Sequence, residues 1–451
     1  MTNSKDTTRV VIVGGGFGGI NAAKKLAKAP VHLTLIDRKN HHTFQPLLYQ
    51  VATAGLSPGD IAAPIRSILR AHENVEVLLG EVTGFDLDRR LVETAEQSYP
   101  YDYLIVAAGA GDSYFGHPEW EILAPGLKTI EDALEIRRRV LLAFELAERQ
   151  AAAGDNTTPV NFVIVGGGPT GVELAGTLAE ICHHALTHEF RSIDPARSHI
   201  LLVEGGPRVL AAYPEDLSRS AEEQLRQLGV QVRTSALVTK VEAGAVDVGA
   251  ERLPAAVVIW AAGVAASPLG AKLGVGVDRA GRVPVQPDCS LPNHPEVFVI
   301  GDLAALKDEH GKMLPGVAPN AIQQGQFVAK VIRREIEAGR GVVANARPKF
   351  HYWDKGSIAT IGRAAAVADI GKIHISGFIA WLSWLCVHIF FLIGFRNRVL
   401  VLFQWAWSYF TYQRGARLIT GSMDLPGWTG SAPVVPDEKA KPQESHAAAA
   451  K

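Results

Sequence analysis

Cysteine is scarce in this chain of 451 residues, which holds only Cys182, Cys289 and Cys386. No two of them form a C-x-x-C pair, so the sequence predicts neither a disulfide framework nor a zinc site. Widely spaced thiols of this kind are typical of small buried hydrophobic side chains. This cysteine usage fits a reducing, cytoplasmic setting.

An excess of charge is also absent, because 45 Lys and Arg residues face 46 Asp and Glu residues. A net charge of −1 implies no general attraction to nucleic acid. The N-terminal residues MTNSKDTTR contain no apolar stretch, so no signal peptide is expected. The length allows two or three domains with large cores.

A complete dinucleotide-binding pattern stands near the N-terminus. An apolar run, Val10 to Val13, leads into Gly14-x-Gly16-x-x-Gly19, and a second apolar run, Val31 to Ile36, ends on Asp37. Such glycines make a tight turn, leave room for a pyrophosphate and allow close packing of helix on strand. The helix N-terminus directs free N–H groups at phosphates, and the acid can accept hydrogen bonds from a ribose. The pattern therefore predicts a Rossmann-like domain.

The same pattern returns in the middle of the chain. Asn161 to Val165 reads as a strand, Gly166 to Gly171 (GGGPTG) as the turn, Val172 to His188 as a helix and His199 to Val203 as a strand that ends on Glu204. The interval before this acid is long, so the helix or its following loop must be extended. Two such patterns imply two bound dinucleotides and electron transfer between them.

Two strands end on small residues, LIVAAG from Leu104 to Gly109 and VVIWAAG from Val257 to Gly263. Ala108, Gly109 and Gly263 would let the backbone approach a cofactor closely. A third apolar strand runs into Gly301-Asp302. The repetition predicts two related nucleotide-binding modules.

Acidic residues are missing from Gly371 to Ile419, although this stretch holds five Lys and Arg residues and four of the eight tryptophans. Two apolar segments, Phe378 to Phe395 and Val399 to Tyr412, flank a predicted turn at Arg396-Asn397-Arg398. Eighteen residues reach roughly 27 Å, and the second segment is shorter still. Amphipathic helices lying in the membrane interface satisfy these features better than a membrane span or a buried dimer interface.

The motifs resemble those of a known family. NHHTFQPLLYQVATAGLSP (Asn40 to Pro58), YFGHPEWE (Tyr114 to Glu121), GPTGVELAG (Gly168 to Gly176) and DKGSIATIGR (Asp354 to Arg363) are similar to segments of the type II, or alternative, NADH:quinone oxidoreductases. These are flavoproteins with two dinucleotide-binding domains. The resemblance covers about Arg9 to Gly421.

The resemblance implies an α/β fold with two Rossmann-like domains and a C-terminal amphipathic region that attaches to the membrane. We expect an FAD-binding domain at 8–119 and 287–346, an NADH-binding domain at 120–286, a C-terminal region at 347–430 with the quinone site, and a disordered tail at 431–451. The partners would be NADH, a membrane quinone and the lipid surface on the cytoplasmic face of the cell membrane. A homodimer is compatible with these features, whereas no nucleic acid partner is expected.

The cofactor-binding set that follows from the patterns and the resemblance falls into two groups. For FAD it comprises Gly14, Gly16, Gly18, Gly19, Asp37, Gln45, Ala108, Gly109 and Asp302. For NADH it comprises Gly166, Gly168, Thr170, Gly171, Glu204 and Gly263. Glu204 would bind ribose hydroxyls and repel a 2′-phosphate, which favours NADH over NADPH.

Four residues are the candidates for catalysis. Glu173 either caps the second helix at its N-terminus or meets the nicotinamide or flavin edge. Lys355 either pairs with Asp354 on the surface or stabilises the negative charge of a reduced quinone, with Gln323 and Gln324 as amide donors. The family often reads Ala-Gln-x-Ala-x-Gln-Gln where this chain has APNAIQQ, so no role passes to the first glutamine, replaced here by Pro319.

Alternatives remain for the chemistry. His41 and His42 could suggest a metal, but no third ligand stands nearby, and the calcium-loop insertion of some relatives is absent. A sulfide:quinone reductase would need two redox cysteines at the flavin, and a disulfide reductase an early C-x₄-C pair. A redox-sensing flavoprotein that signals through partners would bind the same cofactors but would not turn over quinone.

Overall fold

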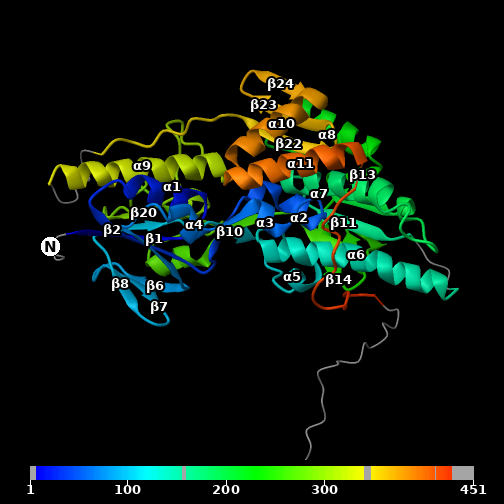
Figure 1. The fold of residues 1–451 in the computed structure, drawn as a ribbon, viewed down its shortest axis with the longest axis horizontal. Coiled ribbons are helices and arrows are strands. Elements are labelled where there is room, and N and C mark those ends of the chain that lie inside the picture. Colours follow the sequence, from blue (N-terminus) through cyan, green and yellow to red (C-terminus); the bar gives the residue numbers. More distant parts are fainter. Residues whose placement is uncertain (1–6, 155–158, 340–346, 412, 429–451) are drawn as a thin grey trace, which may run out of the picture.

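Two parallel sheets form the two ends of the molecule in the computed structural model, which describes residues 7–154, 159–339, 347–411 and 413–428 (Figure 1). The first sheet has the order β20-β9-β1-β2-β5. Its strands are β1 (Thr8–Val13), β2 (Val31–Asp37), β5 (Val75–Leu79), β9 (Tyr103–Val106) and β20 (Val297–Val299). Val10 and Ile12 on one face of the central strand and Val11 and Val13 on the other are all buried, as expected for a strand covered on both faces.

Two helices cover one face of this sheet. These are α1 (Phe17–Leu26), which follows the first glycine turn, and α9 (Ala318–Glu337). A Cβ on Gly325 of α9 would lie 2.3 Å from the carbonyl oxygen of Gly18. The two helices can therefore pack this closely only because position 325 is glycine.

The second sheet has the order β13-β12-β11-β17. It contains β11 (Asn161–Val165), β12 (His199–Val203), β13 (Val230–Arg233) and β17 (Val257–Trp260), with helices α6 (Ile130–Ala152), α7 (Pro169–Glu180) and α8 (Glu215–Gln227). α7 begins three residues before the predicted helix because Pro169 is already set for the first helical position. A π-helical turn, Ile181–Ala185, and a 3₁₀ turn, Pro195–Arg197, then lengthen the path to Glu204, which accounts for the long interval in the sequence.

A narrow antiparallel pair connects the two modules, formed by β10 (Ala110–Asp112) and β18 (Val264–Ala266). Each module also carries a three-stranded antiparallel sheet: β6 (Val82–Asp86), β7 (Leu91–Thr94) and β8 (Ser98–Pro100) in the first, and β14 (Val238–Glu242), β15 (Ala245–Val248) and β16 (Glu251–Pro254) in the second. Shorter elements are β3 (His41–Thr43), η1 (Gln45–Leu47), α2 (Leu48–Ala52), α3 (Pro58–Ile61), β4 (Ala62–Pro64), α4 (Ile65–Leu69), α5 (Trp120–Leu123), η4 (Pro268–Leu273), β19 (Val283–Pro284), η5 (Gly301–Leu303) and β21 (Ala304–Ala305). The domain limits stay predictions, and the limit at 346 and the tail 431–451 lie outside the described residues.

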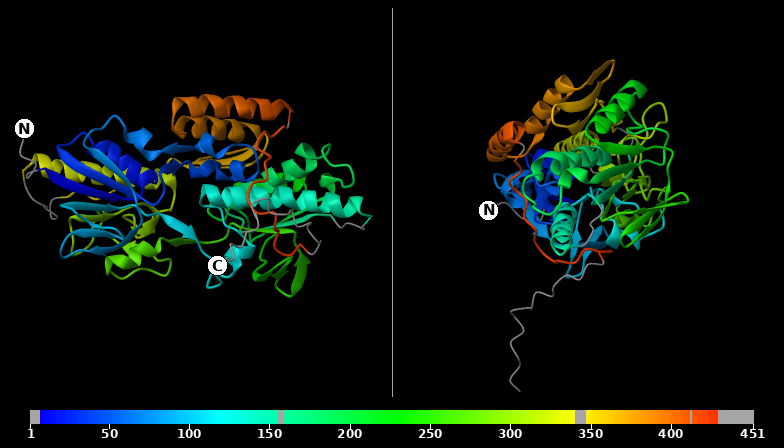
Figure 2. Two further views of the ribbon diagram at one scale, coloured as in Figure 1. Left: turned by 60° about the horizontal axis from the view of Figure 1, so that its bottom comes forward. Right: turned by 90° about the vertical axis from the view of Figure 1, so that its right-hand side faces the viewer.

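The C-terminal part forms a sheet and two helices on one face of the molecule (Figure 2). Its elements are β22 (Ser357–Gly362), β23 (Ala365–Ile370), β24 (Ile373–Ser376), α10 (Phe378–Phe391) and α11 (Phe395–Thr411). A Cβ on Gly176 of α7 would lie 1.5 Å from the carbonyl oxygen of Ile361, so β22 rests directly on the second module. Within the described ranges, no helix has the length and apolar character that crossing a membrane requires.

The predicted turn at Arg396-Asn397-Arg398 is wrong, because these residues form the first turn of α11. The chain reverses instead between Leu392 and Gly394, where glycine supplies a φ of +89°. The Arg398 Nε–H donates to the Leu392 carbonyl oxygen over 2.7 Å and closes this turn. The sequence pattern could not place the turn because Ile393 and Phe395 continue the apolar run on both sides of the glycine.

Candidate active site

In the first glycine turn, the fold requires glycine at two positions, and at a third position glycine leaves space for a ligand. Gly14 has a φ of +103°, and a Cβ there would lie 2.4 Å from the Ala107 carbonyl oxygen. A Cβ on Gly19 would lie 1.8 Å from the Gly14 carbonyl oxygen. A Cβ on Gly16, however, would meet no protein atom within 4 Å. The space in front of Gly16 is therefore open for a phosphate at the N-terminus of α1.

Asp37 lies at the end of β2 beside this turn. Its Oδ2 accepts from the Gly15 amide over 2.5 Å, and its Oδ1 accepts from the Lys39 amide over 2.7 Å. A carboxylate can accept about four hydrogen bonds, so each oxygen keeps capacity for a ribose hydroxyl. The hydrogen bonds from these two amides fix the carboxylate in place before any ligand arrives.

A cavity of about 1300 Å³ joins the predicted FAD residues. It exceeds the usual range for small-molecule sites and so suits a cofactor as large as FAD. Its lining includes Gly14, Gly16, Gly18, Asp37, Gln45, Ala108, Gly109 and Asp302, but neither Gly19 nor Gly263. Phosphate-sized space at Gly16, a fixed acid for ribose and small residues along the wall make these residues fit FAD.

Asp302 stands at the turn of η5 on the wall of this cavity. Burial raises the pKa of its carboxyl group, and the nearby Lys128 ammonium lowers it. Gln324 is buried, and its Oε1 accepts from the Gly301 amide over 2.6 Å. The Gln324 side chain therefore holds the turn that presents Asp302, a contact that the sequence did not indicate.

The second glycine turn repeats the geometry of the first. Gly166 has a φ of +109°, and a Cβ on Gly171 would lie 1.8 Å from the Gly166 carbonyl oxygen. A Cβ on Gly168 would again meet nothing within 4 Å. Glu204 accepts from the Gly167 and Gly206 amides over 2.6 Å each, as Asp37 does in the first module. The structure thus brings together the predicted residues of the second turn, with Thr170 half-buried in the first turn of α7.

Gly263 follows β17 and has a φ of +79°. A Cβ there would lie 2.7 Å from the ring of Phe115, whose own φ is +51° and whose side chain is 68% exposed. Gly109, at the matching place after β9, would leave a Cβ free of contacts. The two strand ends therefore differ, because Gly263 makes room for an aromatic side chain and Gly109 borders the cavity.

The capping interpretation of Glu173 is wrong. α7 has Gly168 as its N-cap and Pro169 as its first residue, so Glu173 lies in the second turn and caps nothing. Burial raises the pKa of Glu173 well above its ordinary value, against a smaller opposite effect of the Thr360 backbone amide on β22. A carboxyl group of this kind can hold a proton near neutral pH.

Lys355 forms no ion pair with Asp354. Among the described residues, no carboxylate lies within 4.0 Å of its Nζ, and Asp354 accepts instead from the Gly356 amide. Its Nζ lies 5.0 Å from the ring centre of Trp353 and 5.9 Å from that of Phe391 on α10. Both geometries are those of cation–π contacts, so the exposed ammonium lies against the C-terminal end of α10.

Gln323 pairs with the backbone of the segment that carries Lys355. Its Nε2 donates to the Trp353 carbonyl oxygen and its Oε1 accepts from the Trp353 amide, each over 3.0 Å. The structure therefore joins Gln323 to Lys355 through Trp353. The roles of Gln323 and Gln324 as donors to a quinone stay predictions.

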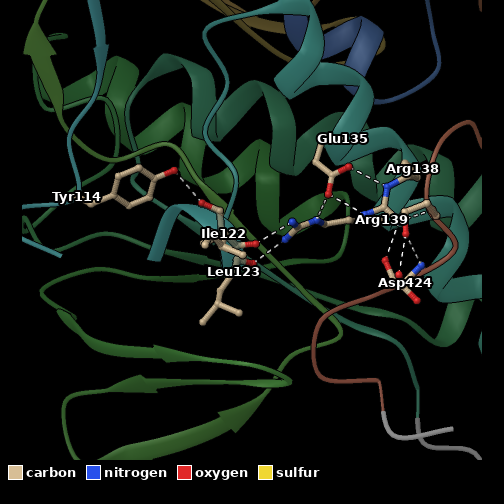
Figure 3. Close-up of polar contacts among 9 residues, drawn as sticks. Tyr114, Ile122, Leu123, Glu135, Arg138, Arg139 and Asp424 are labelled. Atoms are coloured by element: carbon tan, nitrogen blue, oxygen red, sulfur yellow. Dashed lines mark hydrogen bonds and ion pairs between the residues drawn. The ribbon is translucent and has the colours of Figure 1, made fainter. Parts of the chain in front are cut away.

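A charge cluster on α6, which the sequence patterns did not predict, is shown in Figure 3, and its Glu135 and Arg139 line the cavity. Glu135 pairs with both Arg138 and Arg139, whose side chains are each 8% exposed. Arg139 then donates to the carbonyl oxygens of Ile122 and Leu123, each over 2.8 Å. Only the charges on one face of α6 could have signalled this cluster, since the partners of Arg139 beyond Glu135 are backbone atoms.

The same cluster reaches the C-terminal segment. Arg138 donates to the carbonyl oxygens of Ser422 and Asp424 over 2.7 Å each, and the Tyr114 hydroxyl donates to the Ala124 carbonyl oxygen over 2.9 Å (Figure 3). The Arg138 contacts hold the C-terminal segment against α6, and the Tyr114 contact holds the segment that follows β10. In the ranges that the structure describes, no group of three His, Cys, Asp or Glu side chains could hold a metal ion.

Comparison with known proteins matches most of the chain to two family models. Residues 8–325 match the pyridine nucleotide-disulphide oxidoreductase family, and residues 354–412 match the NDH2 C-terminal domain. The chain is 47% identical to the type II NADH:quinone oxidoreductase Ndh of Mycobacterium tuberculosis over 91% of its length and 90% of that relative. It is 28% identical to the type II NADH:quinone oxidoreductase of Staphylococcus aureus, covering 83% of this chain and 92% of the relative.

Solved structures share the fold. NDH2 from Plasmodium falciparum in complex with NADH superposes with a TM-score of 0.81 at 21% identity, over 91% of this chain and 99% of that one. The sulfide:quinone oxidoreductase of Aquifex aeolicus gives a TM-score of 0.69 at 19% identity, over 94% and 100%. That rival activity is not favoured, since Cys182 and Cys289 are buried in different modules and Cys386 lies exposed on α10. The chain therefore belongs to the type II NADH:quinone oxidoreductases, flavoenzymes of the pyridine nucleotide-disulphide oxidoreductase family that use FAD to oxidise NADH and reduce a quinone.

Proposed function

We propose that FAD occupies the cavity at the first glycine turn, that NADH binds at the second, and that quinone enters from the bilayer beneath α10. Bound FAD would supply the two-electron carrier between NADH and quinone. The placement of the quinone rests on the contact between Lys355 and Phe391, because this contact joins a candidate catalytic cation to a helix with an apolar outer surface.

Apolar side chains cover the outer surface of α10 and α11. Phe395, Phe403 and Phe410 are 82%, 70% and 79% exposed, and Trp407 is 62% exposed. Together with Phe378, Ile379, Leu382, Val387, Phe390 and Leu402 they form what we term the anchor surface. These exposed apolar side chains lie in a stretch that carries Arg396 and Arg398 but no acidic residue, which suits a lipid interface and supports peripheral attachment.

The inner face of α10 faces the candidate site. Trp384, His388 and Phe391 lie on one helical face. The ring centre of Trp384 lies 5.0 Å from that of Trp405, and the ring centre of His388 lies 6.1 Å from that of Phe44. The ring centre of Phe391 lies 5.9 Å from the Lys355 Nζ. Burial lowers the pKa of His388 to about 4, so it stays neutral at physiological pH. This aromatic face supports a slot for a quinone ring under α10.

Lys355 and Glu173 would divide the work at this slot. Reduction builds negative charge on the quinone oxygens, and the Lys355 ammonium would stabilise that charge. Glu173, protonated through its burial, would deliver a proton. We place the enzyme on the cytoplasmic face because its cysteines are unpaired and that compartment is reducing.

Rapid mixing separates the two half-reactions and tests the quinone placement. Lys355→Ala should slow flavin reoxidation by a soluble quinone analogue by about 10- to 100-fold, since it removes one stabiliser of the anion. Flavin reduction by NADH should not change. Lys372→Ala, which removes an exposed lysine from the same C-terminal part, is the matched control. Unchanged reoxidation in Lys355→Ala, or an equal loss in the NADH half-reaction, would contradict the placement.

Liposome flotation tests the anchor surface. Phe403→Glu combined with Phe410→Glu should leave the protein with the soluble fraction, because charged side chains are costly in the apolar interface. Activity with a water-soluble quinone should persist. Leu237→Glu, a substitution at a 68% exposed leucine of the second module, serves as the control and should still float. Flotation of the double phenylalanine variant would place the attachment elsewhere.

A further inference from the structure

Two hydrogen bonds in series connect α11 to α2 through three side chains. The Trp405 Nε1–H donates to Oε1 of Gln50 over 2.7 Å, and Gln50 Nε2 donates to the hydroxyl oxygen of Tyr49 over 3.0 Å. Tyr49 is only 2% exposed. The contact between Trp405 and Gln50 spans 355 residues of sequence, so no local pattern announces it.

The chemistry of these groups fixes the direction of every hydrogen bond in the chain. An indole N–H can only donate, so it must meet the oxygen of the Gln50 amide. The amide nitrogen is then directed to Tyr49, whose oxygen accepts. The Tyr49 hydroxyl proton must therefore point away from Gln50. In the part of the chain that the structure describes, Tyr49 donates no hydrogen bond.

An unused donor at this depth requires an explanation, because a buried donor without a partner costs about 1–3 kcal/mol. The charged and titratable groups facing Tyr49 are Glu173 and Glu180 of α7 and Arg414 after α11. Burial raises the pKa of Tyr49 well above its ordinary value, and Glu173 would raise it further whenever its carboxyl group is ionised. The phenol therefore keeps its proton, and no hydrogen bond joins its hydroxyl to the Glu173 carboxyl group.

We propose that the Tyr49 hydroxyl donates a hydrogen bond to an oxygen of the bound quinone, with Gln50 and Trp405 as positioning residues that hold it in the donating direction. This inference rests on the proposed quinone slot beneath α10, whose Trp384 stacks on Trp405. The donor strengthens as negative charge grows on the oxygen, so it stabilises the reduced quinone more than the oxidised one. The hydrogen bond between Trp405 of α11 and Gln50 of α2 would therefore help to position the reactive site.

Rapid mixing of the full-length, FAD-loaded enzyme with a soluble quinone analogue tests Tyr49. Tyr49→Phe should slow flavin reoxidation at saturating quinone by ~10- to 100-fold, as expected for the loss of one donor to a developing anion. Flavin reduction by NADH should stay at the wild-type rate. Tyr101→Phe is the control, because it removes the hydroxyl of a fully buried tyrosine of the first module that also has no hydrogen-bond partner and lies outside the proposed quinone slot. Wild-type reoxidation in Tyr49→Phe would overturn the inference.

A double substitution distinguishes positioning from mere packing. In Trp405→Phe the Gln50 amide is free to rotate and accept the Tyr49 proton, so reoxidation should slow. Adding Gln50→Leu removes that competing acceptor, and the double variant should recover most of the lost rate. Gln50→Leu alone should slow reoxidation less than Trp405→Phe does, because it removes the donor to Tyr49 but adds no competing acceptor. A double variant as slow as Trp405→Phe would refute the positioning role, because loss of packing predicts no recovery.

The outcomes also separate this inference from the slot on which it rests. Slow reoxidation in Lys355→Ala with normal reoxidation in Tyr49→Phe would leave the slot in place and remove Tyr49 from it. Slow reoxidation in Tyr49→Phe with a normal Lys355→Ala would support the donor and move the quinone away from Lys355.

Discussion

Substitution of Gly16 by alanine should abolish tight FAD binding while leaving the fold intact. Gly16 is the N-cap of α1 with φ −72° and ψ −166°, an extended conformation that alanine adopts freely. The added methyl group would meet no protein atom within 4 Å. Replacing glycine by alanine at an N-cap should change the free energy of unfolding of the apoprotein by less than about 1 kcal/mol.

The cost to the cofactor is much larger. The methyl group would occupy the space in which a pyrophosphate approaches the N–H groups at the start of α1. Losing one or two charge-assisted hydrogen bonds costs about 1.5–6 kcal/mol, because each contributes ~1.5–3 kcal/mol. That loss raises the Kd for FAD by ~10- to ~25,000-fold.

Fluorescence titration of the apoprotein with FAD measures this change, and thermal unfolding of the apoprotein checks the fold. Gly168→Ala is a matched control, since Gly168 has φ −72° and ψ −179° at the N-cap of α7 and equal open space. It should keep FAD and weaken NADH. If Gly16→Ala bound FAD normally and lost NADH instead, the two modules would have to exchange their assigned cofactors.

Further changes test the acids and the buried charges. Glu204→Gln should raise kcat/KM for NADPH relative to NADH, because it removes the charge that repels a 2′-phosphate. Steady-state rates with both donors measure this preference, and an unchanged ratio would refute the role of Glu204. Arg414→Leu should lower the free energy of unfolding by ~3–5 kcal/mol in a denaturant titration. The substitution removes the guanidinium group that lies 2.7 Å from the Glu180 carboxylate, and the carboxylate stays buried. Adding Glu180→Leu should restore most of the lost stability. Burial raises the pKa of Asp112 to about 6, so folding favours its protonated form and stability falls as pH rises from about 4 to 6. Asp112→Asn should therefore add ~1–3 kcal/mol above pH 6 and nothing below pH 4, and an equal gain at both values would contradict this reasoning.

Local rules were enough for both nucleotide-binding turns. The strand, glycine turn and acid of each module lie within one stretch of chain, and glycine is required wherever a Cβ would strike the neighbouring backbone. The turns at Gly14 and Gly166 and the acids Asp37 and Glu204 could thus be placed from residue spacing alone. The acid-free, aromatic C-terminal stretch likewise predicted two apolar helices, which α10 and α11 confirm.

The sequence by itself determined the two dinucleotide modules and the family, because glycine spacing and strand-end acids are dictated by local backbone geometry and cofactor chemistry. Tertiary structure alone decided which polar groups meet at the centre of the molecule. Arg414 pairs with Glu180 across 234 residues, Trp405 reaches Gln50 across 355, and Lys355 lies against α10 rather than Asp354. Such contacts depend on how α2, α7 and α11 pack together, and no residue pattern within any one of these helices specifies its neighbours.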